Sequence, residues 1–169
     1  MSDKFTPGDS AAGHSQGALP VSAAATIAEL VDAGVPEHLH RWLIHTGVGS
    51  LVVKMGIVFS EMTPQRMVAT MPVEGNTQVA GILHGGAHVV LAETLGSFAA
   101  TLHAGAGRHA VGIEVGASHH RSVSSGLVTG TATAIQLGRS LTVHEVVMTD
   151  EDGRRLSTAR ITNLIRDNG

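Results

Sequence analysis

Hydrophobic and polar residues are spaced differently in successive parts of the chain. Residues 1–20 are rich in Gly, Ser, Ala and Pro and have no hydrophobic period, so a flexible tail is expected. The alanine-rich stretch 22–33 predicts a helix that begins after Ser22 and is stopped by Gly34 and Pro36. A second short helix is predicted over 36–47. From residue 51 the pattern is extended, and 51–62 and 66–73 are predicted to form a hairpin.

One long helical stretch, 86–105, interrupts the extended segments. Four stretches with alternating apolar and polar residues follow it, a pattern typical of a half-buried antiparallel sheet. In the first of them, Val111, Ile113, Val115 and Ala117 are expected to share one face. Strands grouped around a single helix predict an α+β fold in which the sheet wraps around that helix. The four stretches are 110–118, 126–137, 141–149 and 154–165.

Composition narrows the possible classes of protein. The 169 residues are 43% hydrophobic and 15% charged, which is enough apolar material for one folded domain. Aromatic residues make up 2% and the net charge is -3, so neither stacking rings nor a basic surface favours nucleic-acid binding. The chain has no cysteine, which excludes disulfides and thiolate chemistry. It shows neither an apolar run of about 18 residues nor a signal peptide, so a cytoplasmic protein without a membrane partner is expected.

Glu93 is the only formally charged residue between Gly86 and His103. A helix that is apolar nearly all round is normally buried, so this carboxylate is expected in a largely desolvated place. Ser97 and Thr101 follow Glu93 at helical spacing and extend a narrow polar stripe that would line a cleft or an interface. The alternative is a structural carboxylate held by a neighbouring strand or subunit.

The residues before this helix indicate an anion-binding helix start. Leu83-His84-Gly85-Gly86 leads directly into the helical pattern. Glycines let a ligand approach the backbone closely, and the first N–H groups of a helix have no partner within it. Such groups suit the oxyanion of an acyl-transfer reaction. The alternative interpretation of the glycine pair is an ordinary turn between a loop and a helix.

Eleven histidines in a chain without cysteine raise the question of a metal site. His84 and His88 have the spacing of a helical zinc pair, but no third ligand follows at a familiar interval and the HExxH pattern is absent. His119 and His120 are consecutive, so on a strand they would point to opposite faces. No metal site is therefore expected.

Residues 48–165 resemble the hotdog-fold acyl-CoA thioesterases. The similar branch includes the dihydroxynaphthoyl-CoA hydrolases, the enterobactin-pathway proofreading thioesterase, the phenylacetate-pathway thioesterases and one type of hydroxybenzoyl-CoA thioesterase. The resemblance divides the chain into a flexible tail (1–20), an N-terminal helical extension (21–47) and a hotdog thioesterase domain (48–169). The motifs that carry it are MPVEGNTQVAGILHGGAHVVLAETLGS (71–97), GIEVGASHHRS (112–122), QLGRS (136–140) and DEDGRR (150–155).

The resemblance implies a long helix wrapped by a curved antiparallel sheet, and a homodimer with its active sites at the interface, usually doubled to a homotetramer. It implies that Glu93 is the nucleophile or general base, that the Gly85 N–H binds the thioester carbonyl, and that His84, Gln78 and Ser97 orient the thioester or water. Coenzyme A is then part of the substrate, and no separate cofactor is expected. The implied coenzyme A contacts are Gly112, His119, His120, Arg121, Ser122, Gln136, Leu137, Gly138, Arg139 and Ser140, with Gln136 where the family more often has His.

The leading hypothesis is hydrolysis of an acyl-CoA thioester, with an aryl acyl group such as hydroxybenzoyl, dihydroxynaphthoyl or phenylacetyl. A non-catalytic acyl-CoA-binding hotdog module is the alternative, and it predicts coenzyme A binding without turnover. A hotdog hydratase would pair an Asp with a His in a motif that this chain lacks. Two features stay open: His88, which replaces a small residue of the family, and the N-terminal helices, which would cover a subunit edge, cover the acyl pocket or simply extend the packing.

Overall fold

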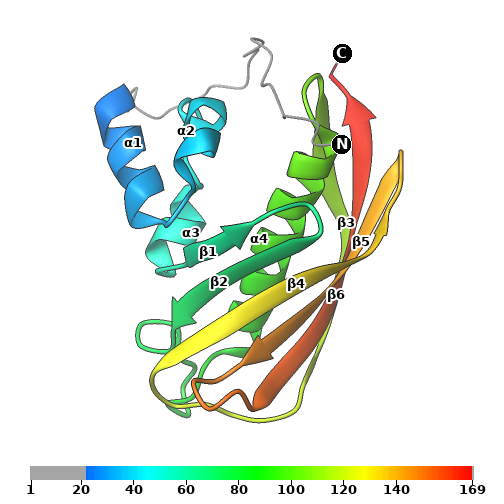
Figure 1. Cartoon of the computed structure of the whole chain (residues 1–169). Coiled ribbons are helices and arrows are strands. Elements are labelled where there is room, and N and C mark those ends of the chain that lie inside the picture. The colour runs from blue at the N-terminus through cyan, green and yellow to red at the C-terminus, as the bar shows by residue number, and fades with distance from the viewer. Residues whose placement is uncertain (1–21, 169) are drawn as a thin grey trace.

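A curved antiparallel sheet wraps around one long helix, and three shorter helices precede the sheet (Figure 1). The computed structural model describes residues 22–168, so the predicted tail lies outside the described residues. The six strands follow the order β1-β2-β4-β5-β6-β3, which leaves β1 and β3 as the two edges. The elements are α1 (Ala23–Asp32), α2 (Glu37–Leu43), α3 (Ser50–Lys54), β1 (Val58–Met62), β2 (Arg66–Pro72), α4 (Gly85–Ala104), β3 (Arg108–His119), β4 (Leu127–Leu137), β5 (Leu141–Thr149) and β6 (Arg155–Asp167).

Helix α4 forms the centre of the core because one of its faces consists of apolar and small residues. Leu91 and Leu95 are fully buried against the sheet. At Gly96 a side chain would collide with Ile161 of β6, so only glycine allows this close approach between helix and strand. The α+β hotdog arrangement that the sequence predicts is thereby confirmed.

The prediction of one strand over 51–62 is wrong for residues 50–54. They form the short helix α3, and β1 begins only at Val58. Helical geometry buries Val52 and leaves Leu51 and Val53 more than half exposed. The β-branched residues favour a strand locally, but packing of Val52 into the core overrides this weak preference. Gly56, with a φ of 66°, then turns the chain into β1.

Strand β3 departs from the regular alternation that its sequence predicts. A bulge between Gly112 and Glu114 inserts one extra residue. Val111 pairs with half-buried Leu164, whereas Val115 pairs with buried Ile161. Val111 and Val115 therefore lie on opposite faces, and the expected single apolar row is wrong because the bulge shifts the register.

The N-terminal helices are packed onto the main core. Leu30 of α1 and Leu39 and Leu43 of α2 are buried in the same cluster as the residues of α4. The Phe59 N–H donates to the Ala33 carbonyl at 2.8 Å, which ties the end of α1 to β1. The helices predicted over 22–33 and 36–47 are present.

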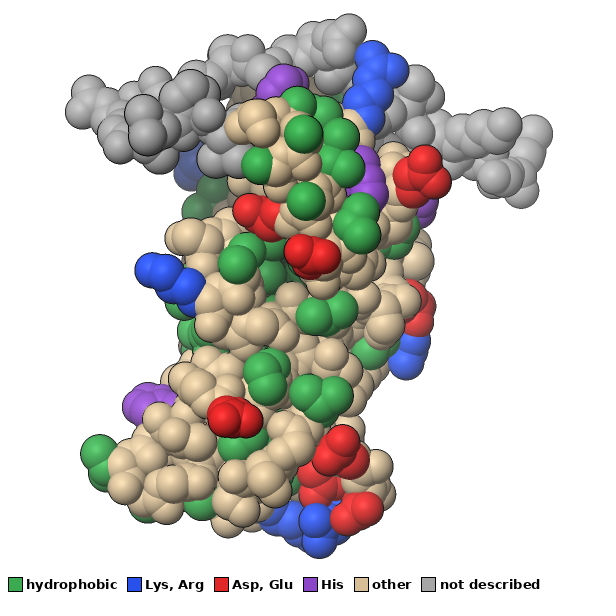
Figure 2. Space-filling model, turned by 90° about the vertical axis from the view of Figure 1, so that its left-hand side faces the viewer, with side chains coloured by type: hydrophobic (Ala, Val, Ile, Leu, Met, Phe, Trp, Pro, Cys, Tyr) green, Lys and Arg blue, Asp and Glu red, His purple; other side chains and the backbone are tan. Residues whose placement is uncertain are grey.

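Figure 2 views the side of the molecule that carries α1 to α3, where apolar side chains reach the surface. Among residues 22–168, no helix is both long and apolar enough to span a membrane.

Candidate active site

The start of α4 offers a backbone N–H without a partner. The His84 N–H donates to the Asn76 carbonyl at 2.9 Å, and the Leu83 N–H donates to the Val123 carbonyl at 2.8 Å, so the preceding loop is held in place. The His84 ring then caps the helix, because its Nδ1 accepts the Gly86 N–H at 2.8 Å. The Gly85 N–H finds no acceptor among the described residues. It lies at the positive end of α4, where it can bind an oxyanion.

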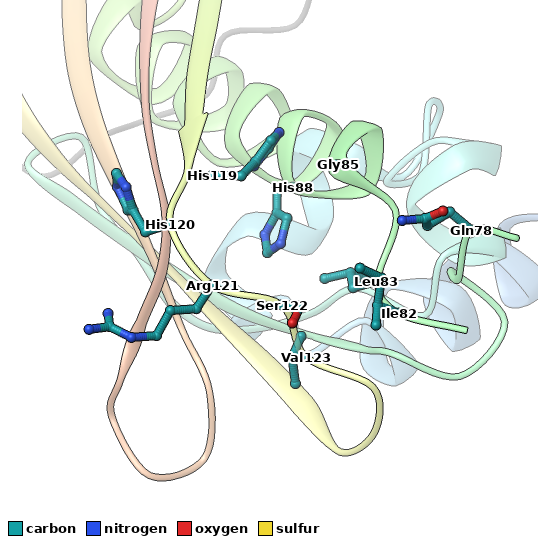
Figure 3. A pocket seen from close by; sticks show the side chains of 10 residues that line it. All are labelled: Gln78, Ile82, Leu83, Gly85, His88, His119, His120, Arg121, Ser122 and Val123. Carbon is teal, nitrogen blue, oxygen red and sulfur yellow. The ribbon is translucent and has the colours of Figure 1, made fainter. Parts of the chain in front are cut away.

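A hollow of about 320 Å³, which we call the histidine hollow, opens beside this helix start (Figure 3). It brings Gln78 and Gly85 together with the predicted coenzyme A contacts at the end of β3 and directly after it, residues 119–122. The Gln78 side chain is held in a tight turn, where its Oε1 accepts the Ala80 N–H at 3.3 Å. The lining residues are Gln78, Ile82, Leu83, Gly85, His88, His119, His120, Arg121, Ser122 and Val123.

His119 and His120 have different surroundings at the end of β3. The Ser157 hydroxyl donates to the Ser118 carbonyl, so its oxygen accepts a hydrogen bond from His119 Nδ1 at 3.0 Å. His119 Nε2 is then left for a ligand, and it lies against Gly85, where an added Cβ would be 2.9 Å away. His120 points away from His119 in Figure 3, and its Nε2 contacts Thr158 Oγ1 at 3.0 Å. A Cβ at Gly85 would press on the His119 ring, which would have to shift to admit even a methyl group.

His88 projects from α4 into the histidine hollow (Figure 3). The residue is only 3% exposed, its Nδ1 has no hydrogen-bond partner, and its ring centroid lies 5.3 Å from that of His119. Burial and then the neighbouring His119 lower the pKa of His88 to about 4. The imidazole is therefore neutral at pH 7 and adds no positive charge to the hollow.

Glu93 lies further along α4 and is exposed in the single chain. The expectation of a desolvated carboxylate is therefore not met within one chain, because the sheet covers the opposite face of the helix. Ser97 follows one turn later, and its hydroxyl donates to Asn163 Oδ1 of β6 at 3.4 Å. A Cβ added at Gly112 would lie 3.7 Å from Glu93 Oε1 and 4.0 Å from Ser97 Oγ. Glu93, Ser97 and Gly112 are thus neighbours, as a shared site requires.

A second hollow, of about 290 Å³, lies between α3 and α4 and includes Glu93 in its wall. We call it the apolar hollow, because every other lining residue except Ser97 and Thr94 is aliphatic or aromatic. Sequence reasoning did not identify its apolar lining, because α3 was predicted as a strand. The lining residues are Val48, Leu51, Val52, Val90, Glu93, Thr94, Ser97 and Phe98.

Comparison with known proteins identifies the family of this chain. Residues 80–157 match the family described as the thioesterase superfamily. The proofreading thioesterase EntH of Cronobacter sakazakii is 46% identical over 121 residues, which are 71% of this chain and 88% of that protein. This chain belongs to the thioesterase superfamily.

Solved structures of thioesterases have the same fold as this thioesterase chain. A thioesterase of Haemophilus influenzae superposes with a TM-score of 0.67 at 38% identity, covering 70% of this chain and 84% of that one. A mutant thioesterase of Pseudomonas aeruginosa superposes with a TM-score of 0.68 at 36% identity, covering 78% and 94%. The protein is a thioester hydrolase with a hotdog fold, as its sequence motifs predict.

The QLGRS block of this thioesterase does not join either hollow. Gln136 and Leu137 end β4, and Gly138, Arg139 and Ser140 form the turn to β5. The Gly138 carbonyl contacts His103 Nε2 at 2.9 Å, at the C-terminal end of α4. At 1.5 Å per residue, that end lies about 27 Å from Gly85. One chain therefore does not bring the two predicted groups of coenzyme A contacts together.

No three His, Asp or Glu side chains between residues 22 and 168 are grouped as ligands for a metal ion. His84 and His88, which have the spacing of a zinc pair, differ in environment: His84 caps α4, whereas His88 is buried beside His119.

The sequence analysis did not identify Asn163, a buried polar residue of β6 that contacts Ser97. Its signal is a polar residue at an inward position of the alternating strand 154–165.

Proposed function

We propose that this thioesterase hydrolyses an aryl-CoA thioester to the free acid and coenzyme A, which enters as part of the substrate rather than as a cofactor. The observation that carries the proposal is the unpaired Gly85 N–H at the start of α4, inside a hollow that also holds His119 and Arg121. An oxyanion donor beside basic and hydrogen-bonding groups suits a thioester carbonyl attached to a phosphate-bearing carrier.

Glu93 is the proposed base or nucleophile, and it lies far from Gly85 of the same chain. The two residues are eight positions apart on one helix, which places them about 12 Å apart along its axis. A carboxylate at that distance cannot act on a carbonyl bound at Gly85 of the same chain, because reacting atoms must approach to about 3 Å. We therefore propose that each active site combines Glu93 of one chain with the partner's Gly85.

The free edge of β3 supports a homodimer of this kind. β3 is a long edge strand, and its apolar residues Val111 and Ile113 are 45% and 55% exposed. Such an edge pairs readily with another strand. In the proposed dimer, a two-fold axis perpendicular to β3 sets the two α4 helices antiparallel and carries the QLGRS block of one chain toward the partner's histidine hollow. Doubling of this dimer to a homotetramer stays a prediction.

In the proposed reaction, Glu93 removes a proton from water, and the resulting hydroxide attacks the thioester carbon. The carbonyl oxygen becomes an oxyanion that the partner's Gly85 N–H stabilises, with Gln78 and His84 at the same helix start and Ser97 beside the water. Collapse of the intermediate breaks the carbon–sulfur bond, and the coenzyme A thiolate takes up the proton that Glu93 holds, which restores the carboxylate. Direct attack by Glu93, through an anhydride that water then cleaves, gives the same products.

The apolar hollow beside Glu93 supports an aryl acyl group. Its volume of about 290 Å³ is at the lower end of the range for small-molecule pockets. Phe98 contributes an aromatic ring to the wall and is itself held edge-on by Phe59, with ring centroids 5.1 Å apart. A compact ring fits such a space better than a long fatty chain.

Thiol release from a panel of aryl- and fatty-acyl-CoA esters tests the proposal, with wild type and Glu93→Gln side by side. Wild type is expected to cleave an aryl ester fastest. Glu93→Gln is expected to lose about 10²–10⁴-fold in kcat, because the amide cannot accept the proton. It should keep the wild-type inhibition constant for free coenzyme A. Coenzyme A binding without turnover of any ester would instead support a non-catalytic binding module.

A further inference from the structure

The N-terminal helices contribute indirectly to the apolar hollow. The family match begins at residue 80, so α1, α2 and α3 all precede it. Val48, Leu51 and Val52 nevertheless form the α3 side of the hollow, opposite Val90 and Phe98 of α4. The width of the hollow therefore depends on where α3 lies relative to α4.

Two glycines in the left-handed region lie in the segment that leads into α3. Val48 stands between Gly47 and Gly49, whose φ values are 62° and 93°. Glycine adopts such conformations readily but also has the largest conformational freedom of any residue. Helix α3 is only five residues long, and Gly49 at its N-cap has no side chain to cap it. Packing of Val48 and Val52 into the core holds the segment in place, together with one contact from outside it.

Glu29 of α1 provides that restraint. Its Oε1 accepts the Val48 N–H at 2.8 Å, a contact between residues that are 19 positions apart. The carboxylate also lies against Gly47, where any side chain would collide with it. Helix α1 is itself anchored, because Leu30 is fully buried in the core. The hydrogen bond thus connects the core to the α3 wall of the hollow.

We propose that Glu29 is a positioning residue that holds α3 against α4 and thereby restricts the hollow to compact acyl groups. The inference rests on the proposed function, since it assigns the acyl group to the apolar hollow. Glu29 is not among the residues that line the hollow. It acts through Val48, whose side chain is 5% exposed and lines the hollow. Without Glu29, α3 can move outward and admit bulkier acyl groups.

The test compares Glu29→Ala with Glu29→Gln, whose amide oxygen still accepts the Val48 N–H. Asp32→Ala is the matched control, because Asp32 is an exposed carboxylate on the same helix with no partner among the described residues. For each protein, kcat/KM is measured with benzoyl-CoA and with 2-naphthoyl-CoA. Glu29→Ala should lower the ratio of benzoyl to naphthoyl turnover about tenfold, the scale of one hydrogen bond to a charged group. Glu29→Gln and Asp32→Ala should keep the wild-type ratio.

Two further readouts separate positioning from a loss of stability. The inhibition constant for free coenzyme A should be the same in wild type and in all three variants. The predicted coenzyme A contacts at 119–122 line the histidine hollow at the start of α4, away from α3. Hydrogen–deuterium exchange should become faster at 47–55 in Glu29→Ala and stay unchanged in α4. An equal fall in turnover of both esters with an unchanged ratio would overturn the inference and leave the proposed function intact.

A wild-type protein that cleaves no ester would contradict the proposed function and, with it, the role of Glu29 in acyl choice. Hydrogen–deuterium exchange would in that case still test whether Glu29 holds α3 in place. Unchanged exchange at 47–55 in Glu29→Ala would show that Glu29 does not hold α3.

Discussion

The histidine hollow and the apolar hollow lie on the same helix and have similar volumes, about 320 and 290 Å³, but their walls differ. The first is lined by Gln78, three histidines and Arg121 and includes the Gly85 N–H, which has no acceptor within residues 22–168. The second is aliphatic and aromatic, with Glu93 as its one ionisable group. The polar wall suits the carbonyl and its carrier, whereas the apolar wall suits the acyl group. In the proposed dimer, the histidine hollow of one chain and the apolar hollow of its partner together form the complete site.

The sharpest test of the histidine hollow is Gly85→Pro compared with Gly85→Ala. Proline removes the N–H but suits the first position of a helix, and His84, with φ −68° and ψ 133°, already has the conformation that precedes proline. Alanine keeps the N–H and adds the same Cβ beside His119. We expect Gly85→Pro to lose about 10²–10³-fold in kcat relative to Gly85→Ala. Equal rates for the two variants would remove Gly85 from the oxyanion role.

Mixing inactive chains tests whether the two hollows act across a dimer. In a co-expressed equimolar mixture of Glu93→Gln and Gly85→Pro chains, half of the dimers are mixed, and each mixed dimer has one intact site. Steady-state thiol release should therefore recover to about a quarter of the wild-type rate. A mixture of Glu93→Gln with Glu93→Ala serves as the control and should stay inactive. If the first mixture also stays inactive, Glu93 and Gly85 do not act from different chains.

Acid should destabilise the histidine hollow. The pKa of His88 is lowered to about 4 by burial and His119, whereas an unfolded histidine titrates near 6.5. Between pH 4 and pH 6.5 the unfolded chain therefore binds more protons than the folded chain. The contribution of neutral His88 to the free energy of unfolding is fully present above pH 6.5 and is lost as the pH falls toward 4. The loss from His88 is up to about 3 kcal/mol.

Urea unfolding at pH 7 and pH 4.5 measures this effect. His88→Leu should lose less stability on acidification than wild type, and His38→Leu, at an exposed position of α2, should lose as much as wild type. The free energy of unfolding should still fall somewhat with acid in every variant, because burial also lowers the pKa of His144. An identical loss in His88→Leu and wild type would show that His88 is not buried as a neutral group.

Most of the fold was predictable because its elements have clear local patterns. The apolar stretch 86–105 is too long for a strand, and it forms α4; the alternating stretches form β3 to β6. The start of α3 was predicted wrongly, since Leu51-Val52-Val53 favours a strand and only the packing of Val52 makes it helical. The bulge in β3 was also missed, because nothing in its regular alternation indicates an extra residue.

The candidate site residues were predictable as chemical types but not as a geometry. The motif His84-Gly85-Gly86 and the lone charge of Glu93 indicated an oxyanion donor and a base. Their separation along α4 follows from the rise of a helix, whereas the exposure of Glu93 became known only from the folded chain, because the sheet covers the opposite face of the helix. The apolar lining at Val48 and Phe98 could not be predicted, because residues 50 positions apart meet there only after folding.

The sequence by itself determined the class of fold, the family and the groups available for chemistry, because periodicity and short motifs are local properties of the chain. The tertiary structure decided which of these groups are neighbours. It placed His119 beside both His88 and Gly85, Asn163 beside Ser97, and the Glu29 carboxylate on the Val48 N–H. Each of these contacts joins different elements of the fold, and such contacts arise from how helices and strands pack rather than from the pattern within any one of them.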